Sequence, residues 1–357
     1  MKKPVPTIKL SIGSFDFIKG LLMICIVFGH SSSMYLPDQA DMNPALVYII
    51  KFIASATNPL LFICSGMLYK DKDPKKLLKA TFHDLIIPYL WVGLGVTICF
   101  PIVSYILFHS LENALSETFK YIVTFLLGYQ ASGETIFGIS VYECAVVHFL
   151  LALFIANNLL NLILKIKNDI IAGAICLASA FASVFLYAAG LRVYCIPEGL
   201  MALMFVYAGY MIKKYDLINK VNSKPWLYLI IFAISCVAVR VGSFDMVHSE
   251  YNYPVLDSIG VLFPAFFLLA IGLIIGQSDN KFLDIFKTIG MYAYWILCLH
   301  SIELICIPWY KWMTKFENHK VLAYIGEMCI NIAFIAIGCY IIKKYTSLKY
   351  RRKVKHV

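Results

Sequence analysis

The sequence is poor in charged residues. Asp, Glu, Lys and Arg together make up 15% of its 357 residues, whereas 61% are hydrophobic and the mean hydropathy is +0.77. A water-soluble domain needs roughly a quarter of its residues charged to keep its surface hydrated. The composition therefore excludes an ordinary soluble globular protein.

The chain also lacks paired cysteines. Its eleven cysteines are scattered, nearly all within apolar runs, and no two of them form a CxxC pair or a zinc-type cluster with histidine. This distribution argues against a disulfide framework and a metal site, and it suits cysteine as a small hydrophobic residue. We therefore expect no metal. A small-residue cleavage site is likewise missing after the first apolar run, so we expect that run to remain as a membrane helix.

What the sequence does contain is a series of apolar runs, several longer than the ~18 residues that mark a membrane span. They predict an all-α integral membrane protein with about ten transmembrane helices. We expect a single multi-pass domain, residues 1–357, ending in a short basic tail, 343–357. The expected spans are Phe15–Tyr35, Val47–Leu68, Leu85–Phe108, Ile139–Leu164, Ile170–Ala189, Val193–Ile212, Trp226–Val241, Val255–Ile275, Ile289–Trp309 and Val321–Ile342. The amphipathic segment Glu112–Tyr129 is expected to lie at the membrane interface.

Lysines are concentrated in every second loop between these runs, and acidic residues occupy the others. Lysines follow the second, fourth, sixth and eighth runs, while Asp38 and Asp41, or Asp245 and Glu250, occur in the alternate loops. The positive-inside rule then predicts that both termini are cytoplasmic in a cell membrane. The net charge of +10 is accounted for by these loops. We therefore expect the lipid bilayer, and no nucleic acid, as a partner.

Ionisable side chains within the first expected span form a stripe. Lys19 and His30 are eleven residues apart, which places them on one helix face about 16 Å apart. Asp16 falls on the same face. Charged groups inside a membrane are costly and usually functional. The alternative is that Asp16 and Lys19 form an interfacial ion pair and that His30 is a hydrogen-bonded packing residue.

Further polar groups fall near or beyond the membrane midplane by residue counting. They are Glu143, His148, Glu198, His300, Glu303 and Glu327, with Arg240 closing a span on the outer side. Each alone could be a structural hydrogen bond between helices, but together they predict a cavity. We also expect Asn58-Pro59 to break the second helix at this depth, where unwound backbone is tolerated only against protein or water.

Several of these segments resemble the membrane-bound acyltransferase-3 family. Phe15–Gly20 followed by Phe28-Gly29-His30 is similar to the family's opening motif, a basic residue, ten apolar residues and His, and the Lys form resembles the fucose 4-O-acetylase-like branch. Other similar segments occur in the family's order: Asn58–Gly66, Leu85–Tyr89, His148–Phe154, Phe205–Tyr210 and Gly290–Glu303. Two departures are that His83 and Asp84 stand where the family has arginines, and that His148 stands where it has Trp.

The resemblance implies an O-acyltransferase that moves an acyl group, usually acetyl from acetyl-coenzyme A, to a hydroxyl of an extracytoplasmic or lipid-linked carbohydrate. The donor is anionic and cytoplasmic, so candidates for its binding are basic groups at the inner mouth. These candidates are Lys19 with Asp16, and Lys75, Lys76 and Lys79. Candidate catalytic residues are His30 as general base, with His300, Glu198 and Glu303. Candidate acceptor-binding residues are Asn58, Glu143, His148 and Arg240.

Alternatives remain open at this point. The positive-inside bias alone could account for Lys75, Lys76 and Lys79. His30 could act as a general base or form an acyl intermediate. Buried charges and a broken helix would also suit a transporter or flippase for small polar or sugar-linked molecules, although no inverted repeat is evident. A membrane sensor or scaffold is a third possibility, but the loops and tails are too short for a signalling domain.

Overall fold

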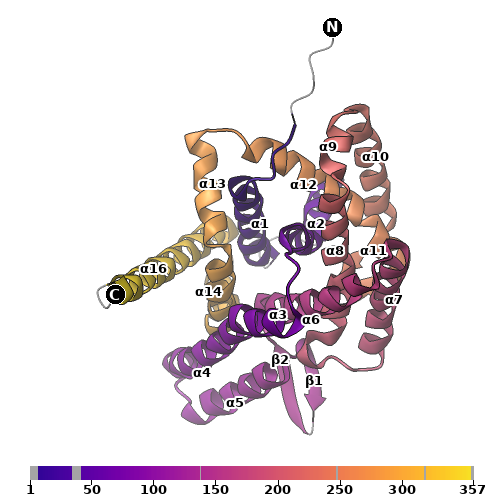
Figure 1. The fold of residues 1–357 in the computed structure, drawn as a ribbon. Coiled ribbons are helices and arrows are strands. Elements are labelled where there is room, and N and C mark those ends of the chain that lie inside the picture. The colour runs from indigo at the N-terminus through magenta and orange to yellow at the C-terminus, as the bar shows by residue number, and fades with distance from the viewer. Residues whose placement is uncertain (1–6, 34–41, 137, 247, 317–318, 355–357) are drawn as a thin grey trace.

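The computed structural model describes residues 7–33, 42–136, 138–246, 248–316 and 319–354, with the backbone alone for 131, 132 and 345–354. Tyr35, Asp38, Asp41 and the last three residues of the basic tail lie outside the described residues. Helices form nearly all of the described chain (Figure 1). The helices are α1 (Ile12–Ser33), α2 (Pro44–Leu68), α3 (Pro74–Thr81), α4 (Ile87–Phe108), α5 (Leu111–Leu127), α6 (His148–Ile163), α7 (Asp169–Ala188), α8 (Ile196–Lys214), α9 (Leu217–Asn222), α10 (Trp226–Val241), α11 (Pro254–Gly260), α12 (Leu262–Gly276), α13 (Lys281–Met291), α14 (Ala293–Cys306), α15 (Trp309–Lys315) and α16 (Lys320–Val354).

Eight segments of the described chain are helical, long and apolar enough to cross a membrane. They are Ile12–Ser31, Pro44–Leu68, Pro74–Phe108, Ala145–Ile166, Asp169–Ala188, Val193–Lys214, Pro254–Gly276 and Lys320–Lys344. A ninth crossing is possible through α13 and α14, which are bent by 65° at the break between them. The remaining expected span, α10, has 16 residues, short of the ~20 that a bilayer requires. The expected count of ten and the cytoplasmic termini therefore stay predictions.

Two short hairpins interrupt the helices, and the sequence patterns did not predict them. β1 (Gln130–Ile136) pairs antiparallel with β2 (Ile139–Glu143), and β3 (Phe244–Asp245) pairs with β4 (Glu250–Tyr251). The expected start of a span at Ile139 is thus wrong. Ile139 belongs to β2, and the helix begins only at His148, after a 3₁₀ turn.

The expected break at Asn58-Pro59 is also wrong, because α2 continues through Pro59 to Leu68. Proline removes one hydrogen-bond donor from a helix and normally kinks it. Here Pro59 is buried, and α2 packs on α8, α12 and α1. Neighbouring helices can hold such a helix in shape after the loss of one bond.

Glycines allow the closest helix contacts. A Cβ atom on Gly66 of α2 would lie 1.9 Å from the carbonyl oxygen of Val206, and one on Gly209 of α8 would lie 2.0 Å from that of Ile63. Gly20 of α1 and Gly290 of α13 face each other's backbone in the same way, at 1.9 and 1.7 Å from the nearest oxygens. Small residues that bring helix backbones together are typical of packing within membranes.

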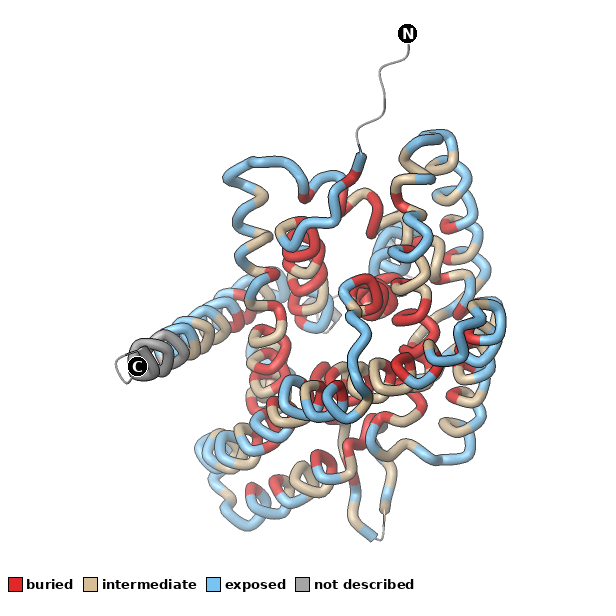
Figure 2. The backbone as a smooth tube through the Cα atoms, viewed as in Figure 1, coloured by how far each residue is buried: buried red, intermediate tan, exposed pale blue. Residues whose placement is uncertain are grey.

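Burial is greatest along the central helices. Figure 2 shows buried residues concentrated on α1, α2, α8 and α14, while much of α4, α10 and α16 is exposed. Trp91, Leu229 and Ile337 are examples of large apolar side chains left exposed on these outer helices. An apolar outer surface of this kind is suited to contact with lipid. Polar residues buried inside the bundle include His148, His300 and Glu303.

Candidate functional site

Two cavities enter the bundle from opposite ends of the same four helices, α1, α2, α6 and α14. One has a volume of about 510 Å³ and is lined by His30, His148 and His248 among others. We call it the histidine pocket. The other has a volume of about 400 Å³ and is lined by Lys19, Lys70 and Lys72 among others. We call it the lysine pocket.

His30 reaches the histidine pocket from the last turn of α1. Its ring centroid lies 5.8 Å from that of His300 on α14. His300 is fully buried, and its Nδ1 atom is 2.8 Å from a carboxylate oxygen of Glu303. The other Glu303 oxygen accepts a hydrogen bond from the Trp309 indole. A carboxylate in this position holds the proton on Nδ1 and orients the ring. Behind His30 there is therefore a second imidazole with a fixed orientation.

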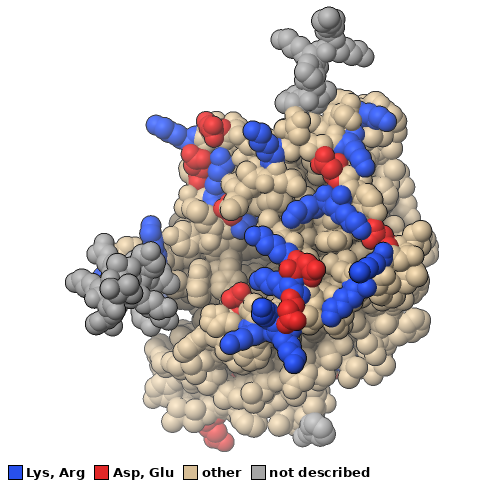
Figure 3. All heavy atoms as spheres, in the orientation of Figure 1, with Lys and Arg blue, Asp and Glu red and all other residues tan. Residues whose placement is uncertain are grey.

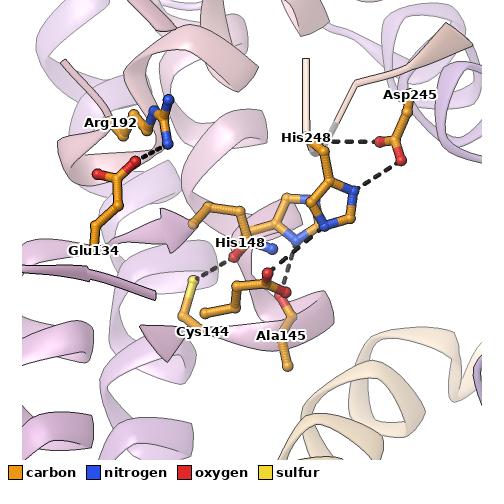
Figure 4. A network of polar contacts seen from close by, with 9 residues as sticks. Glu134, Cys144, Ala145, His148, Arg192, Asp245 and His248 are labelled. Atoms are coloured by element: carbon orange, nitrogen blue, oxygen red, sulfur yellow. Dashed lines mark hydrogen bonds and ion pairs between the residues drawn. The ribbon is translucent and has the colours of Figure 1, made fainter. Parts of the chain in front are cut away.

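The rim of the histidine pocket is formed by the two hairpins. His248 contacts Asp245 through Nδ1 at 2.8 Å and Glu143, at the end of β2, through Nε2 at 3.6 Å. Figure 4 shows the His248 side chain against Asp245. The hydrogen bond to Asp245 and the nearby Glu143 carboxylate favour the protonated ring and raise the pKa of His248 to about 10. His248 is therefore a cation that links the two hairpins at neutral pH.

A second ion pair braces the longer hairpin. Arg192, which follows α7, binds Glu134 of β1, and its guanidinium lies 4.0 Å from the centre of the Tyr187 ring. Tyr129 donates a further hydrogen bond to Glu134. Figure 4 shows the Arg192 side chain against Glu134. The hairpin that carries Glu143 is thereby attached to the helices around it.

The lysine pocket, unlike the histidine pocket, is lined by several lysine side chains. Lys19 lies 2.6 Å from Asp16 one turn earlier on α1, and the lysine side chain remains partly exposed. Lys70 and Lys72 come from the segment between α2 and α3. Figure 3 shows Lys and Arg gathered across the face that carries α3 and the ends of α1 and α2. This cavity can therefore accept an anionic ligand from that face.

The cavities have three lining residues in common: Leu61 of α2, Phe149 of α6 and Leu297 of α14. On α1 the lining passes from Met23, in the lysine pocket, to Ile26, in the histidine pocket. Three residues of helix span only about 4.5 Å. A thin apolar layer thus separates a basic cavity from a cavity rich in imidazole and carboxylate groups.

The structure places some of the expected site residues in the two cavities. His30, Asn58, Glu143 and His148 all line the histidine pocket, and Lys19 lines the lysine pocket. His300 and Glu303 lie directly behind His30. The sequence interpretation therefore brought together residues from α1, α2, β2, α6 and α14 that do lie close in space.

Other expected residues lie elsewhere. Lys75, Lys76 and Lys79 are exposed on α3, Arg240 is exposed at the end of α10, and none of the four is among the residues that line either cavity. Glu198 is buried near the start of α8 and also lines neither cavity. Within the part of the chain that the structure describes, neither of its carboxylate oxygens has a hydrogen-bond partner.

Sequence analysis missed several polar residues of the site. Lys51, Asp245, His248 and Asp257 line the histidine pocket. His248 and Asp245 belong to a loop between helices, where polar residues are ordinary, so no pattern marked them. Lys51 is the only basic residue between Asn43 and Leu68. A single lysine within an expected membrane span could have marked it as a candidate site residue. Among the residues described, no group of three or more His, Cys, Asp or Glu side chains could hold a metal ion.

Comparison with known families identifies an acyltransferase domain. The sequence model described as an acyltransferase domain matches residues 12–344, nearly the whole chain. No curated protein and no solved structure matches the chain.

Proposed function

Because this chain belongs to the acyltransferase family whose domain spans residues 12–344, we propose that it is an acetyl-coenzyme A-dependent O-acyltransferase acting on carbohydrate. Its acceptor is a hydroxyl of an extracytoplasmic or lipid-linked sugar. The Lys19-x10-His30 motif supports the fucose 4-O-acetylase-like branch. The protein is a multi-pass membrane protein, and we propose that it lies in the cell membrane with both termini in the cytoplasm.

The observation that carries this proposal is the meeting of the two cavities at Leu61, Phe149 and Leu297. The lysine pocket suits the donor, because coenzyme A is anionic and Lys19, Lys70 and Lys72 supply cations at its mouth. The histidine pocket suits the acceptor, because carbohydrates need several hydrogen-bonding groups. Asn58, Gln130, Glu143 and Lys51 line that pocket. The acyl group has only the thin shared layer to cross.

In the proposed reaction, His30 takes the proton of the acceptor hydroxyl as its oxygen attacks the thioester carbonyl. A carbon–oxygen bond forms, the carbon–sulfur bond breaks, and the coenzyme A thiolate leaves and takes the proton from the imidazolium. General-base assistance of this kind contributes about 10²–10⁴-fold. His300, held by Glu303, supports the imidazole of His30 from behind. An acyl-His30 intermediate uses the same atoms in two steps.

The test measures acetyl transfer to an acceptor hydroxyl by the full-length protein in sealed proteoliposomes. Radiolabelled acetyl-coenzyme A is supplied on one side and a set of methyl glycosides on the other. The proposal expects label in the ester and release of one thiol for each ester formed. Movement of an unmodified glycoside across the bilayer with no ester formed would favour a transporter and overturn the proposal.

A further inference from the structure

The residues shared by the two cavities have a common chemistry. Leu61, Phe149 and Leu297 are all apolar, and they come from three different helices. Leu61 and Leu297 are buried, whereas Phe149 is only partly buried. Among the described residues, the three that line both cavities carry no polar side-chain atom, so an apolar group passes this layer at a lower desolvation cost than a polar one.

Phe149 is held in place from behind. Its ring centroid lies 4.5 Å from that of Phe62 on α2, with the planes inclined by 30°. Phe62 is fully buried, so other parts of the bundle enclose it. Aromatic pairs at this separation add stability beyond the area that they bury. The Phe149 ring therefore packs on a buried ring while lining both cavities.

Polarity changes within one helical turn on either side of this layer. On α2, Asn58 lines the histidine pocket and Ser65 the lysine pocket, three and four residues from Leu61. On α6, His148 lines the histidine pocket next to Phe149. Polar side chains therefore lie within about one turn of the shared layer, whereas the layer itself is made of Phe149 and the two leucines.

We propose that Leu61, Phe149 and Leu297 form a constriction that selects short acyl groups, with the Phe149 ring as the main determinant of length. This inference rests on the proposed function and specifies its donor. An acetyl methyl fits against the Phe149 ring, and each added methylene must displace one of the three packed side chains. In an apolar pocket one methylene changes a rate by about 10–200-fold. We therefore expect transfer to fall about tenfold or more from acetyl to propionyl and again to butyryl.

The experiment measures thiol release from acetyl-, propionyl-, butyryl- and hexanoyl-coenzyme A by the full-length protein in proteoliposomes, with water or methyl glycosides as acceptors. Phe149→Ala should reduce the preference for acetyl over butyryl by about tenfold or more. Leu297→Ala, on a different helix, should also reduce the ratio of the acetyl rate to the butyryl rate. This variant replaces Phe149→Ala in the test if Phe149→Ala folds poorly. Phe149→Trp should sharpen the preference for acetyl.

Phe154→Ala is the matched control, because Phe154 lies on the same helix and is not among the residues lining either cavity. It loses the same ring without widening the shared layer, so its acetyl-to-butyryl ratio should equal that of the wild type. Equal ratios in Phe149→Ala, Leu297→Ala and the control would overturn the selection proposal. An absence of thiol release from every donor by the wild type would instead overturn the proposed function.

Discussion

The His30 and His300 rings lie 5.8 Å apart, and His300 is bound at 2.8 Å to Glu303. Of these two histidines, only His30 is among the residues that line the histidine pocket. The two histidines therefore have different positions relative to a ligand there. His30 can reach it, whereas His300 can act only through its neighbour, which makes it a positioning residue.

This difference predicts unequal effects of substitution. His30→Gln preserves hydrogen bonding but cannot accept a proton near neutral pH, so the transfer rate should fall about 10²-fold or more. Binding of acetyl-coenzyme A should persist, because His30 does not line the lysine pocket. Single-turnover rates and isothermal titration measure the two effects. Substantial transfer by His30→Gln, together with none by His300→Ala, would mean that the roles are reversed.

Lys19 should affect the donor rather than the chemistry. A hydrogen bond to a charged group contributes about 1.5–3 kcal/mol, so Lys19→Ala should raise the apparent KM for acetyl-coenzyme A about tenfold or more. Lys19→Arg should have a smaller effect. Lys75→Ala is the comparison, since that exposed side chain is not among the residues lining the lysine pocket. An unchanged KM in Lys19→Ala would leave Lys19 only as the ion-pair partner of Asp16.

The cation at His248 predicts a pH dependence of stability. Its folded pKa of about 10 lies above the ordinary value of 6.5, so the protonated ring stabilises the folded state. This contribution is complete below about pH 6.5 and is lost progressively as the pH rises to about 10. Thermal unfolding in detergent should therefore separate the wild type from His248→Gln most at pH 6 and least at pH 10. A difference that stays constant over this range would contradict the assignment.

Close helix packing predicts a large effect at Gly66. A methyl group there would lie 1.9 Å from the Val206 carbonyl oxygen, so α2 and α8 must separate. Overpacking typically costs about 1–3 kcal/mol. Gly66→Ala should therefore lower the unfolding temperature in detergent. Gly29→Ala is the control, because a methyl group at Gly29 would meet nothing within 4 Å. Equal unfolding temperatures for the two variants would argue against the close contact.

Topology can be tested across α10, the 16-residue helix. If basic loops are cytoplasmic, a cysteine introduced near Asp245 should react with an impermeant thiol reagent outside intact cells. A cysteine near Lys220 should react only after the membrane is opened. Cysteines near Ser116 and Lys72 extend the test, as outer and inner positions respectively. If the cysteine near Lys220 reacted in intact cells while the cysteine near Asp245 was protected, the ten-helix prediction would be contradicted.

The sequence by itself determined the properties that depend on local chemistry. Low charge and long apolar runs indicated the membrane class, and the family motifs predicted an acyltransferase domain over nearly the whole chain. Helix geometry placed Lys19 and His30 on one face of α1, and both line cavities. These inferences succeed because composition and helical periodicity are fixed by residues close together in the chain.

The tertiary structure decided which distant residues meet. Leu61, Phe149 and Leu297 are ordinary apolar residues within apolar runs, and only the packing of α2, α6 and α14 brings them to one level. The same holds for His248, whose ion pair with Glu143 joins it to the other hairpin. Apolar side chains contact one another without directional preference. The order of residues along each helix therefore could not specify which helices would enclose the two pockets, or that one aromatic ring would stand between them.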